Sequence, residues 1–430
     1  MENISDQLLP KLIGLKSNEI QDMKTAVSDG NQSIYVTMVR KRPECCPKCG
    51  CIDHVVSNGY YQRKILTSSE ILEGDTLYLK LPRWYCEDCR SSFSQEQYLA
   101  PQRNRISYAT VMKVMELLKD PHITFEDAGN LCKVSPSSVI RVFDRHCHLP
   151  SVTFPEAMCI DEVYTKDSDF KDSKYSCIFY DFYRHRLVDV LPARTKNYLH
   201  HYFQPYQGTG CLNTVRYIVM DMHSPYRDIA RLYFKKAILC VDSFHVIKQL
   251  NDSLSNLRIR VMKRYEPGSI EYYLLKNWNW LLFDRTVELD NKGKFNKRLG
   301  RYVNYRQLLE LLLSIDDQLR LAWQIKEEYT NFNATATYES AQELLEEQIQ
   351  KITISNIPEY GRFLSSICHW RKEIVNSFIT YKGFRLNNGV AESLNATVST
   401  LLFNTRGIRN SERRKKRIMY AVNKDQFLIG

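Results

Sequence analysis

The sequence predicts a mixed α+β protein in which a sheet-containing core is interrupted by an all-helical insertion. Three observations predict this class. Two Cys-x-x-Cys pairs lie in the N-terminal part, strand-like and helix-like runs alternate in the middle, and apolar residues then recur at three-and-four spacing. The chain therefore divides into five predicted parts: a cysteine-rich module (1–100), a helical pair (101–150), the first part of the core (151–250), the helical insertion (251–379) and a final helix with a basic segment (380–430).

The composition is that of a globular protein with room for several domains. The chain has 430 residues, of which 43% are hydrophobic and 12% aromatic. Its formal net charge of +11 favours a polyanionic partner, although mildly basic proteins are common and charge alone does not decide. No uncharged apolar run approaches the roughly 18 residues of a membrane span, and Met1–Lys16 carries early acids, unlike a signal peptide. We therefore expect a cytoplasmic protein whose 13 cysteines are ligands or reduced core residues.

The N-terminal cysteines predict a structural zinc site. Four of them form two Cys-x-x-Cys pairs: Cys46 with Cys49, and Cys86 with Cys89. Four soft thiolates suit tetrahedral Zn²⁺, and the strand-like run Thr76–Leu81 between the pairs is typical of a zinc ribbon. Unrelated reduced cysteines are the alternative. Three further residues lie close enough in sequence to replace a ligand: Cys45, Cys51 and His54.

The next part predicts a helix-turn-helix. Thr124–Leu131 has the pattern of a short helix that Thr124 caps, with Asp127 completing an acidic variant of the capping box. A turn at 132–134 leads to Ser135, which caps a second helix from Pro136 to Asp144. In a helix-turn-helix the second helix enters the DNA major groove, and three of its residues would face outward: Ser137, Ser138 and Arg141. An ordinary helical hairpin has the same local pattern.

Two aspartates follow predicted core strands and are candidate metal ligands. The expected strands are Met158–Asp161, Tyr175–Asp181, Arg186–Leu191, Val215–Asp221 and Ala237–Val241, with helices at 196–206 and 226–234. If the strands that end at Asp161 and Asp221 are neighbours, their carboxylates converge, which is how proteins hold divalent metal ions for phosphoryl transfer. This order of elements resembles the ribonuclease-H-like fold, in which a third acid arrives on a later helix.

The insertion and the final segment supply that helix. We expect helices at 271–283, 308–329 and 337–352, with Trp278 and Trp280 in core packing rather than in base stacking. Asn388 or Gly389 can start the last helix, on which Glu392 and Asn395 share a face. A lone glutamate is usually solvated, but this one follows two strand-end aspartates. The basic residues beyond it form either a solvated face or a phosphate-binding surface: Arg406, Arg409, Arg413, Arg414, Lys415, Lys416 and Arg417.

Taken together, the motifs resemble those of ISL3-family insertion-sequence transposases over the whole chain. The resemblance rests on both Cys-x-x-Cys pairs and on five later motifs: Ile160-Asp-Glu162, Val219-Met-Asp-Met222, Val241-Asp-Ser-Phe-His-Val246, Asn388-Gly-Val-Ala-Glu-Ser-Leu-Asn395 and Thr405-Arg-Gly-Ile-Arg-Asn410. It implies a DDE catalytic triad of Asp161, Asp221 and Glu392 that binds two Mg²⁺ (or Mn²⁺) ions on a ribonuclease-H-like core. Asp242 competes with Asp221 as the second acid. We prefer Asp221, which ends the fourth strand, and we assign Asp242 and His245 a supporting or structural role.

The same resemblance implies a function and its partners. We expect a DNA transposase that binds the terminal inverted repeats of a mobile element, cleaves strands and joins them to target DNA, as a homodimer when two ends are paired. The zinc and helix-turn-helix modules would recognise the ends. Two alternatives remain open: a former transposase that acts as a DNA-binding regulator, and a nuclease of the same fold that cuts without joining.

Overall fold

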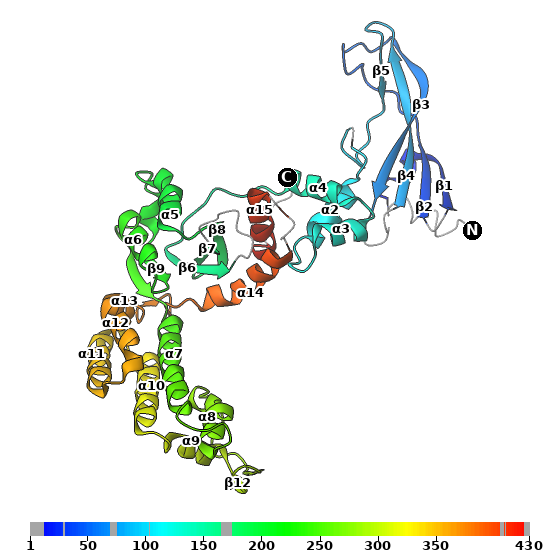
Figure 1. Ribbon diagram of the computed structural model, residues 1–430. Helices are drawn as coiled ribbons and strands as arrows, with labels where there is room; N and C mark the ends of the chain where they lie inside the picture. The colour runs from blue at the N-terminus through cyan, green and yellow to red at the C-terminus, as the bar shows by residue number, and fades with distance from the viewer. Residues whose placement is uncertain are drawn as a thin grey trace. The chain divides into compact units, whose positions relative to one another are not determined.

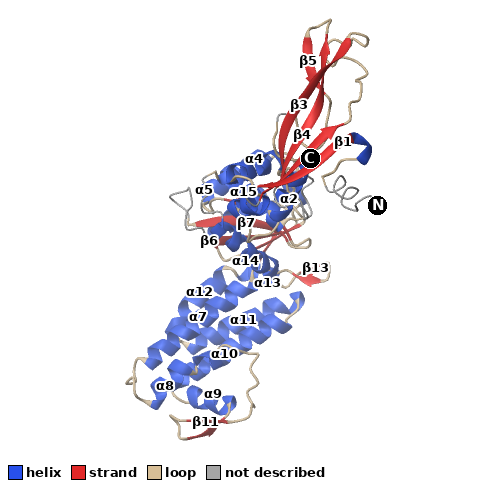
Figure 2. Ribbon diagram, turned by 90° about the vertical axis from the view of Figure 1, so that its right-hand side faces the viewer, coloured by secondary structure: helices blue, strands red, loops and turns tan. Residues whose placement is uncertain are grey.

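The chain folds into two compact units. The structure is a computed structural model that describes residues 13–28, 31–68, 75–102, 104–164, 174–404, 408 and 410–424. The first unit comprises Met1–Pro150 together with Thr397–Gly430, and the second comprises Ser151–Ala396. Figures 1 and 2 label their elements.

The first unit begins with a five-stranded sheet. Its strand order is β1-β2-β4-β3, with β5 paired to β4. The strands are β1 (Ile20–Ser28), β2 (Asn31–Met38), β3 (Val55–Thr67), β4 (Asp75–Cys86) and β5 (Ser91–Ser94). Alternate residues of β2 and β4, such as Ile34 and Leu77, pair in register and are buried. This sheet therefore has an apolar core of its own, which the sequence analysis did not predict.

Three helices follow the sheet: α2 (Tyr108–Leu117), α3 (Phe125–Cys132) and α4 (Pro136–His146). The capping box of Thr124 and Asp127 is present, and Ser135 caps α4 with Pro136 as its first residue, so these predicted helix starts are confirmed. The turn between α3 and α4 passes close to Gly129, where an added Cβ would lie 2.8 Å from the carbonyl oxygen of Val134. A glycine is therefore needed at this position.

A C-terminal helix, α15 (Ser411–Val422), packs on these three helices. Tyr420 is buried, its ring meets Phe143 edge-on at 5.7 Å, and its hydroxyl donates to the carbonyl of Met115 at 2.9 Å. Arg413 forms a bidentate ion pair with Asp144. The helix that carries the basic run is therefore an integral part of the helical core.

One residue of the predicted DNA-binding set, Arg417, does not lie on the surface. Its side chain is buried and donates to the carbonyls of Asp120 at 2.9 Å and Ile123 at 2.8 Å. Burial lowers the pKa of this guanidinium to about 10. Arg417 therefore lies inside the fold instead of facing a phosphate, because the apolar face of α15 turns it inward.

The second unit contains a mixed five-stranded sheet of order β10-β9-β6-β7-β8. Its strands are β6 (Ala157–Tyr164), β7 (Tyr175–Asp181), β8 (Arg186–Leu191), β9 (Tyr217–Met220) and β10 (Ile238–Val241). β6, β7 and β8 are antiparallel, whereas β9 runs parallel to both β6 and β10. Two helices, α5 (Lys196–Phe203) and α6 (Ser224–Tyr233), share the sheet's core through buried residues such as Phe203 and Tyr226.

One predicted strand end is wrong. Asp161 was expected to end its strand, but β6 continues to Tyr164. The reason is tertiary: β9 stops pairing with β6 at Ile160, whereas β7 pairs with β6 as far as Tyr164. Asp161 therefore lies where the parallel pairing ends but the antiparallel pairing continues.

Helices dominate the rest of this unit (Figure 2). They are α7 (Ser243–Met262), α8 (Ile270–Asn277), α9 (Tyr305–Leu313), α10 (Asp317–Thr335), α11 (Tyr338–Ser355), α12 (Gly361–His369), α13 (Arg371–Asn376) and α14 (Gly389–Asn404), whose last residues belong to the first unit. The helix expected at 308–329 is divided, because Asp316 caps a new helix through the N–H of Leu319. None of the helices that the structure describes is long and apolar enough to cross a membrane.

The predicted insertion is not entirely helical. A two-stranded hairpin, β11 (Lys294–Asn296) and β12 (Arg301–Val303), lies between α8 and α9. Beyond the predicted insertion, a second small hairpin, β13 (Thr380–Tyr381) and β14 (Phe384–Arg385), precedes α14. Strands of two or three residues are too short to show alternation, so hydrophobic periodicity could not reveal them.

Replacing Arg417 with alanine is expected to loosen the helical part of the first unit. The change removes the hydrogen bonds to the carbonyls of Asp120 and Ile123 and opens a cavity at a buried position, which typically costs about 2–4 kcal/mol. Amide hydrogen exchange in α15, measured by mass spectrometry on the full chain, should accelerate at least about tenfold. Arg141→Ala, at an exposed position on α4, is the control and should leave exchange unchanged. Equal exchange in the two variants would contradict a structural role for Arg417.

Candidate active site and metal centres

Three aspartates form a row across the sheet of the second unit. The parallel strands β6, β9 and β10 are adjacent, and their residues pair in register: Ile160 with Met220, and Met220 with Val241. The next residue on each strand is an aspartate: Asp161, Asp221 and Asp242. Neighbouring strands lie about 4.8 Å apart, so the register alone gathers three carboxyl groups at one edge. The sequence predicted that Asp161 and Asp221 would meet, and they lie on adjacent strands.

Asp242 is fully engaged by the protein. One of its oxygens accepts a hydrogen bond from His245 Nδ1 at 3.0 Å, and the other accepts from the backbone N–H of Asn388 at 3.1 Å. Its side chain is almost completely buried. Because Asp242 directly precedes α7 and Asn388 directly precedes α14, this carboxylate ties the starts of both helices to the sheet.

His245 supplies positive charge to two of the three aspartates. Its Nδ1 also lies 2.8 Å from Asp221 Oδ1, but only the contact with Asp242 has hydrogen-bond geometry. Burial by itself lowers the pKa of His245, but the carboxylates of Asp221 and Asp242 outweigh burial and raise it to about 10. The imidazole is therefore a cation at neutral pH.

Asp161 is held by the last long helix of the unit. Its Oδ2 accepts from Asn395 Nδ2 at 2.6 Å, and Asn395 in turn accepts from the hydroxyl of Tyr180. Its Oδ1 accepts from the backbone N–H of Glu162 at 2.7 Å. Burial, and then the charge of Asp221, raise the pKa of Asp161 to about 7. Near neutral pH this aspartate is thus poised between its protonated and charged forms.

These groups fit a divalent cation. Among the described residues, only His245 forms an ion pair with these three acids, which leaves excess negative charge at a largely buried edge. Asp221 Oδ1 and both polar atoms of the Asn388 amide are buried without a hydrogen-bond partner in the described part of the chain. Oxygen donors of this kind are the ligands that Mg²⁺ and Mn²⁺ prefer. Both oxygens of Asp242 accept hydrogen bonds, whereas Oδ1 of Asp221 accepts none and only meets the imidazole of His245 at 2.8 Å.

A different ligand set is also geometrically close. Ligand atoms of Asp221, Asp242 and His245 all lie within 4.8 Å of one another. A metal ion bound there would displace the proton on His245 Nδ1 and break the bond that this nitrogen donates to Asp242. In the structure, His245 Nδ1 lies 2.8 Å from Asp221 Oδ1 and 3.0 Å from Asp242 Oδ2.

The third predicted acid is only partly defined. Glu392 belongs to α14, but its side chain lies outside the described residues. Its position is three residues before Asn395, on the same side of the helix. The sequence analysis placed these two residues on one face but did not assign Asn395 to Asp161. The spacing of three residues between Glu392 and Asn395 was the sequence feature that could have pointed to Asn395 as part of the site.

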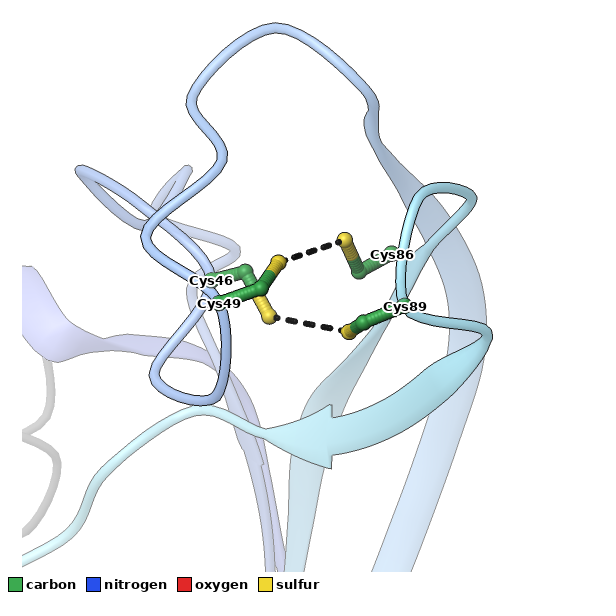
Figure 3. A group of neighbouring side chains, drawn as sticks. All are labelled: Cys46, Cys49, Cys86 and Cys89. Carbon is green, nitrogen blue, oxygen red and sulfur yellow. Dashed lines mark hydrogen bonds between the residues drawn. The ribbon is translucent and has the colours of Figure 1, made fainter.

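Four cysteines of the first unit converge as the sequence predicted (Figure 3). The Sγ atoms of Cys46 and Cys89 are 3.6 Å apart, as are those of Cys49 and Cys86. A tetrahedral site with Zn–S bonds of about 2.3 Å requires sulfurs about 3.8 Å apart, so the four thiols need almost no movement to bind zinc. The hydroxyl of Ser91, 2.7 Å from Cys89 Sγ, helps to lower the pKa of that thiol to about 6.

The competing ligands are less well placed. Cys45 is exposed, and the imidazole of His54 pairs with Asp88 at 2.6 Å. Cys51 groups with Cys86 and Asp88 but not with the other three cysteines. The described residues therefore favour one site of four cysteines, with the hydrogen-bonded pair of His54 and Asp88 beside it.

The predicted DNA-binding residues have varied surroundings. Ser137 and Arg141 are exposed on α4, whereas Ser138 is half-buried and packs its hydroxyl against Ser135. In α15, Lys416 pairs with Glu412 at 3.4 Å, and Arg414 and Lys415 are half-buried. Two of the predicted residues lie outside the described part of the chain: Arg406 and Arg409.

Comparison with known protein families gives one match. Residues 158–418 match the family model DDE_Tnp_ISL3, described as a transposase. The matched region is well over half of the chain and runs from β6 into α15. No curated protein matches the chain.

Cys86→Ser is expected to remove bound zinc. The purified wild-type chain should contain one zinc per molecule by elemental analysis, because four thiolates fill a tetrahedral site. The serine variant should lose most of it and melt at a lower temperature, since the metal stabilises this module. Cys45→Ser, which changes the exposed cysteine beside Cys46, is the matched control and should keep its zinc. Wild-type zinc content in the Cys86 variant would contradict the site.

Divalent metal binding at the aspartate row should strengthen as pH rises. Asp161 must lose its proton to bind a cation, and its pKa is raised to about 7. Mn²⁺ affinity, measured from the free-ion paramagnetic resonance signal, should therefore increase by up to about tenfold per pH unit from 6 to 7 and level off above. Asn395→Leu removes a donor that favours the carboxylate, so the curve should move to higher pH. A flat profile between pH 6 and 8 would contradict this account.

Proposed function

The chain belongs to the ISL3 family of transposases, and we propose that it is a DNA transposase that cleaves and joins strands by metal-dependent phosphoryl transfer. The observation that carries the proposal is the row of largely buried aspartates on adjacent parallel strands, each at the point where the parallel pairing ends. Such a site has hard oxygen ligands and surplus negative charge.

The core that carries the row is proposed to be ribonuclease-H-like. Support comes from the strand order β10-β9-β6-β7-β8, with three antiparallel strands followed by two parallel ones. Further support comes from the position of the acids and from the long insertion between β10 and α14. In such a fold, residues far apart in the sequence, such as Asp161 and Glu392, would reach the same site.

Asp161, Asp221 and Glu392 are the proposed ligands for two Mg²⁺ or Mn²⁺ ions. When bound, such ions lower the pKa of an attacking water or hydroxyl and stabilise the leaving 3′ oxygen. The protein keeps the ligands in place: Asn395 and Tyr180 orient Asp161, and the imidazolium of His245 offsets the charge of Asp221. Asp242 holds His245 and, through the N–H of Asn388, the start of the helix that carries Glu392.

Recognition of DNA is assigned to the first unit. The proposed four-cysteine zinc module and the proposed helix-turn-helix of α3 and α4 would bind the element's inverted repeats, with Ser137, Ser138 and Arg141 toward the major groove. Phosphate contacts would come from Arg406, Arg409 and the half-buried basic residues of α15, without the buried Arg417. Pairing of two DNA ends would require a homodimer.

Removing one proposed metal ligand should abolish catalysis but not DNA binding. Asp161→Asn, Asp221→Asn and Glu392→Gln should each lower strand cleavage by at least about 10³-fold, which corresponds to roughly 4 kcal/mol of lost transition-state stabilisation. The substrate is a duplex that carries the DNA flanking the coding region. Asp228→Asn, at an exposed aspartate paired with Lys196, is the matched control and should cleave normally. Cleavage near the wild-type rate by any of the three would remove that residue from the triad.

A strand-joining assay distinguishes a transposase from a nuclease. Supplied with pre-cut ends that carry a free 3′-OH, the wild-type protein should join them to target DNA, and the three variants should not. Cleavage without any joined product would support the metal site but would identify the protein as a nuclease that hydrolyses DNA without strand transfer.

A further inference from the structure

A basic hairpin lies at the end of the helical segment farthest from the sheet in the second unit (Figures 1 and 2). It consists of β11, β12 and the turn between them. Residues 292–302 contain basic side chains and no acidic ones: Lys292, Lys294, Lys297, Arg298 and Arg301. All of these residues are exposed. In the part of the chain that the structure describes, none forms an ion pair, whereas nearby Arg306 is paired with Asp290 at 2.6 Å.

The hairpin is fixed in position. Asn296 is buried, and its Oδ1 accepts the backbone N–H groups of Arg298 at 3.0 Å and Leu299 at 3.2 Å. Its amide also donates to the hydroxyl of Tyr273 on α8 at 3.1 Å. Gly300 completes the turn with a φ of 64°. The cations are therefore presented by a rigid turn anchored to a helix.

Two aromatic side chains occupy the outward face of the hairpin. Phe295 and Tyr302 are directly opposite each other in the register, with ring centroids 5.4 Å apart. They are 53% and 73% exposed, while Asn296 and Val303 on the other face are buried. A cross-strand aromatic pair stabilises a hairpin by at most about 1 kcal/mol, and it does not explain why unpaired cations surround it. Apolar rings among unpaired cations match a polyanion that also offers apolar surface.

We propose that this hairpin inserts into the major groove of duplex DNA, a contact that extends the DNA interface of the proposed transposase beyond the first unit. The groove is wide enough for a two-stranded β-ribbon. The lysines and arginines would contact the phosphates on either side, and Phe295 and Tyr302 would meet the base edges, where thymine methyl groups offer apolar contact. This inference rests on the proposed function, because it takes DNA as the substrate.

The geometry of the unit also gives the distance from the site of strand cleavage. α7 begins directly after Asp242 and is 20 residues long, so it extends about 30 Å from the aspartate row. α8 packs at its far end and carries the hairpin, through contacts such as that of Arg258 with the carbonyl of Leu275 at 2.8 Å. At about 3.4 Å per base pair, the hairpin meets DNA at least about one helical turn from the scissile phosphate.

The experiment measures DNA binding by the full chain at several salt concentrations. The probe is a fluorescent duplex of about 40 base pairs of arbitrary sequence, roughly four helical turns. Lys294→Ala, Lys297→Ala and Arg301→Ala are combined in one variant. Since each phosphate contact contributes about 0.9 to the slope of log K against log salt, the slope should fall by roughly 3. Affinity at about 0.15 M salt should fall at least tenfold.

Two further variants make the readout specific. Phe295→Ala with Tyr302→Ala should weaken binding severalfold and leave the salt slope unchanged, since no charge is removed. Lys235→Ala with Lys236→Ala, at exposed positions between α6 and β10, is the control and should match the wild type. Thermal unfolding should coincide for the wild type, the triple variant and the lysine control, because these side chains are exposed, whereas loss of the aromatic pair should cost at most about 1 kcal/mol.

The possible failures are distinguishable. A wild-type chain that binds and cleaves DNA, together with a triple variant of unchanged salt slope, would overturn the hairpin proposal and leave the proposed function standing. Loss of self-association in the triple variant, with DNA binding intact, would also overturn it and identify the hairpin as a contact between copies of the chain. A wild-type chain that binds no DNA would overturn both proposals.

Discussion

The second unit must offset the negative charge of three aspartates, which the strand register brings together at a largely buried edge of the sheet. Burying a carboxylate without a partner is strongly unfavourable, and like charges on adjacent strands make it more so. The protein reduces this cost in two ways: the imidazolium of His245 lies against Asp221 and Asp242, and the pKa of Asp161 rises to about 7. The remaining imbalance is what a bound divalent cation would offset.

The same edge also organises the chain around it. Asp242 directly precedes α7, which begins the helical insertion, and its other oxygen holds the N–H that precedes α14, where the chain returns. Asn395 then fastens α14 to Asp161. An insertion of more than a hundred residues can therefore leave the core and return without disturbing the site, because both of its junctions are bonded to the sheet. In the first unit, the four-cysteine cluster joins the two segments that carry its cysteine pairs, and α15 packs on the helices α2, α3 and α4.

Local patterns predicted much of this structure, and long-range packing accounts for the misses. The Cys-x-x-Cys pairs, the capping residues Thr124 and Ser135 and the strands at 175–181 and 186–191 depend on neighbouring residues, and the structure has them as predicted. The extension of β6 past Asp161 depends on unequal pairing by its two neighbours, which no local signal encodes. Likewise, a run of basic residues does not reveal that Arg417 turns inward, and the hairpin strands are too short to show a period. Within the site, Asp221 and Asp242 were predictable because each directly follows a strand, whereas Asp161 lies inside β6. The roles of Asn388, Asn395 and Tyr180 appear only in three dimensions.

The most direct test of the central claim is to locate Mn²⁺ by anomalous diffraction in crystals of the full chain. The account predicts manganese bound to Asp161 and Asp221, with Asp242 still accepting its hydrogen bond from His245. Manganese held by Asp242 and His245, away from Asp161, would contradict it, and so would the absence of bound manganese at an alkaline pH at which Asp161 is ionised.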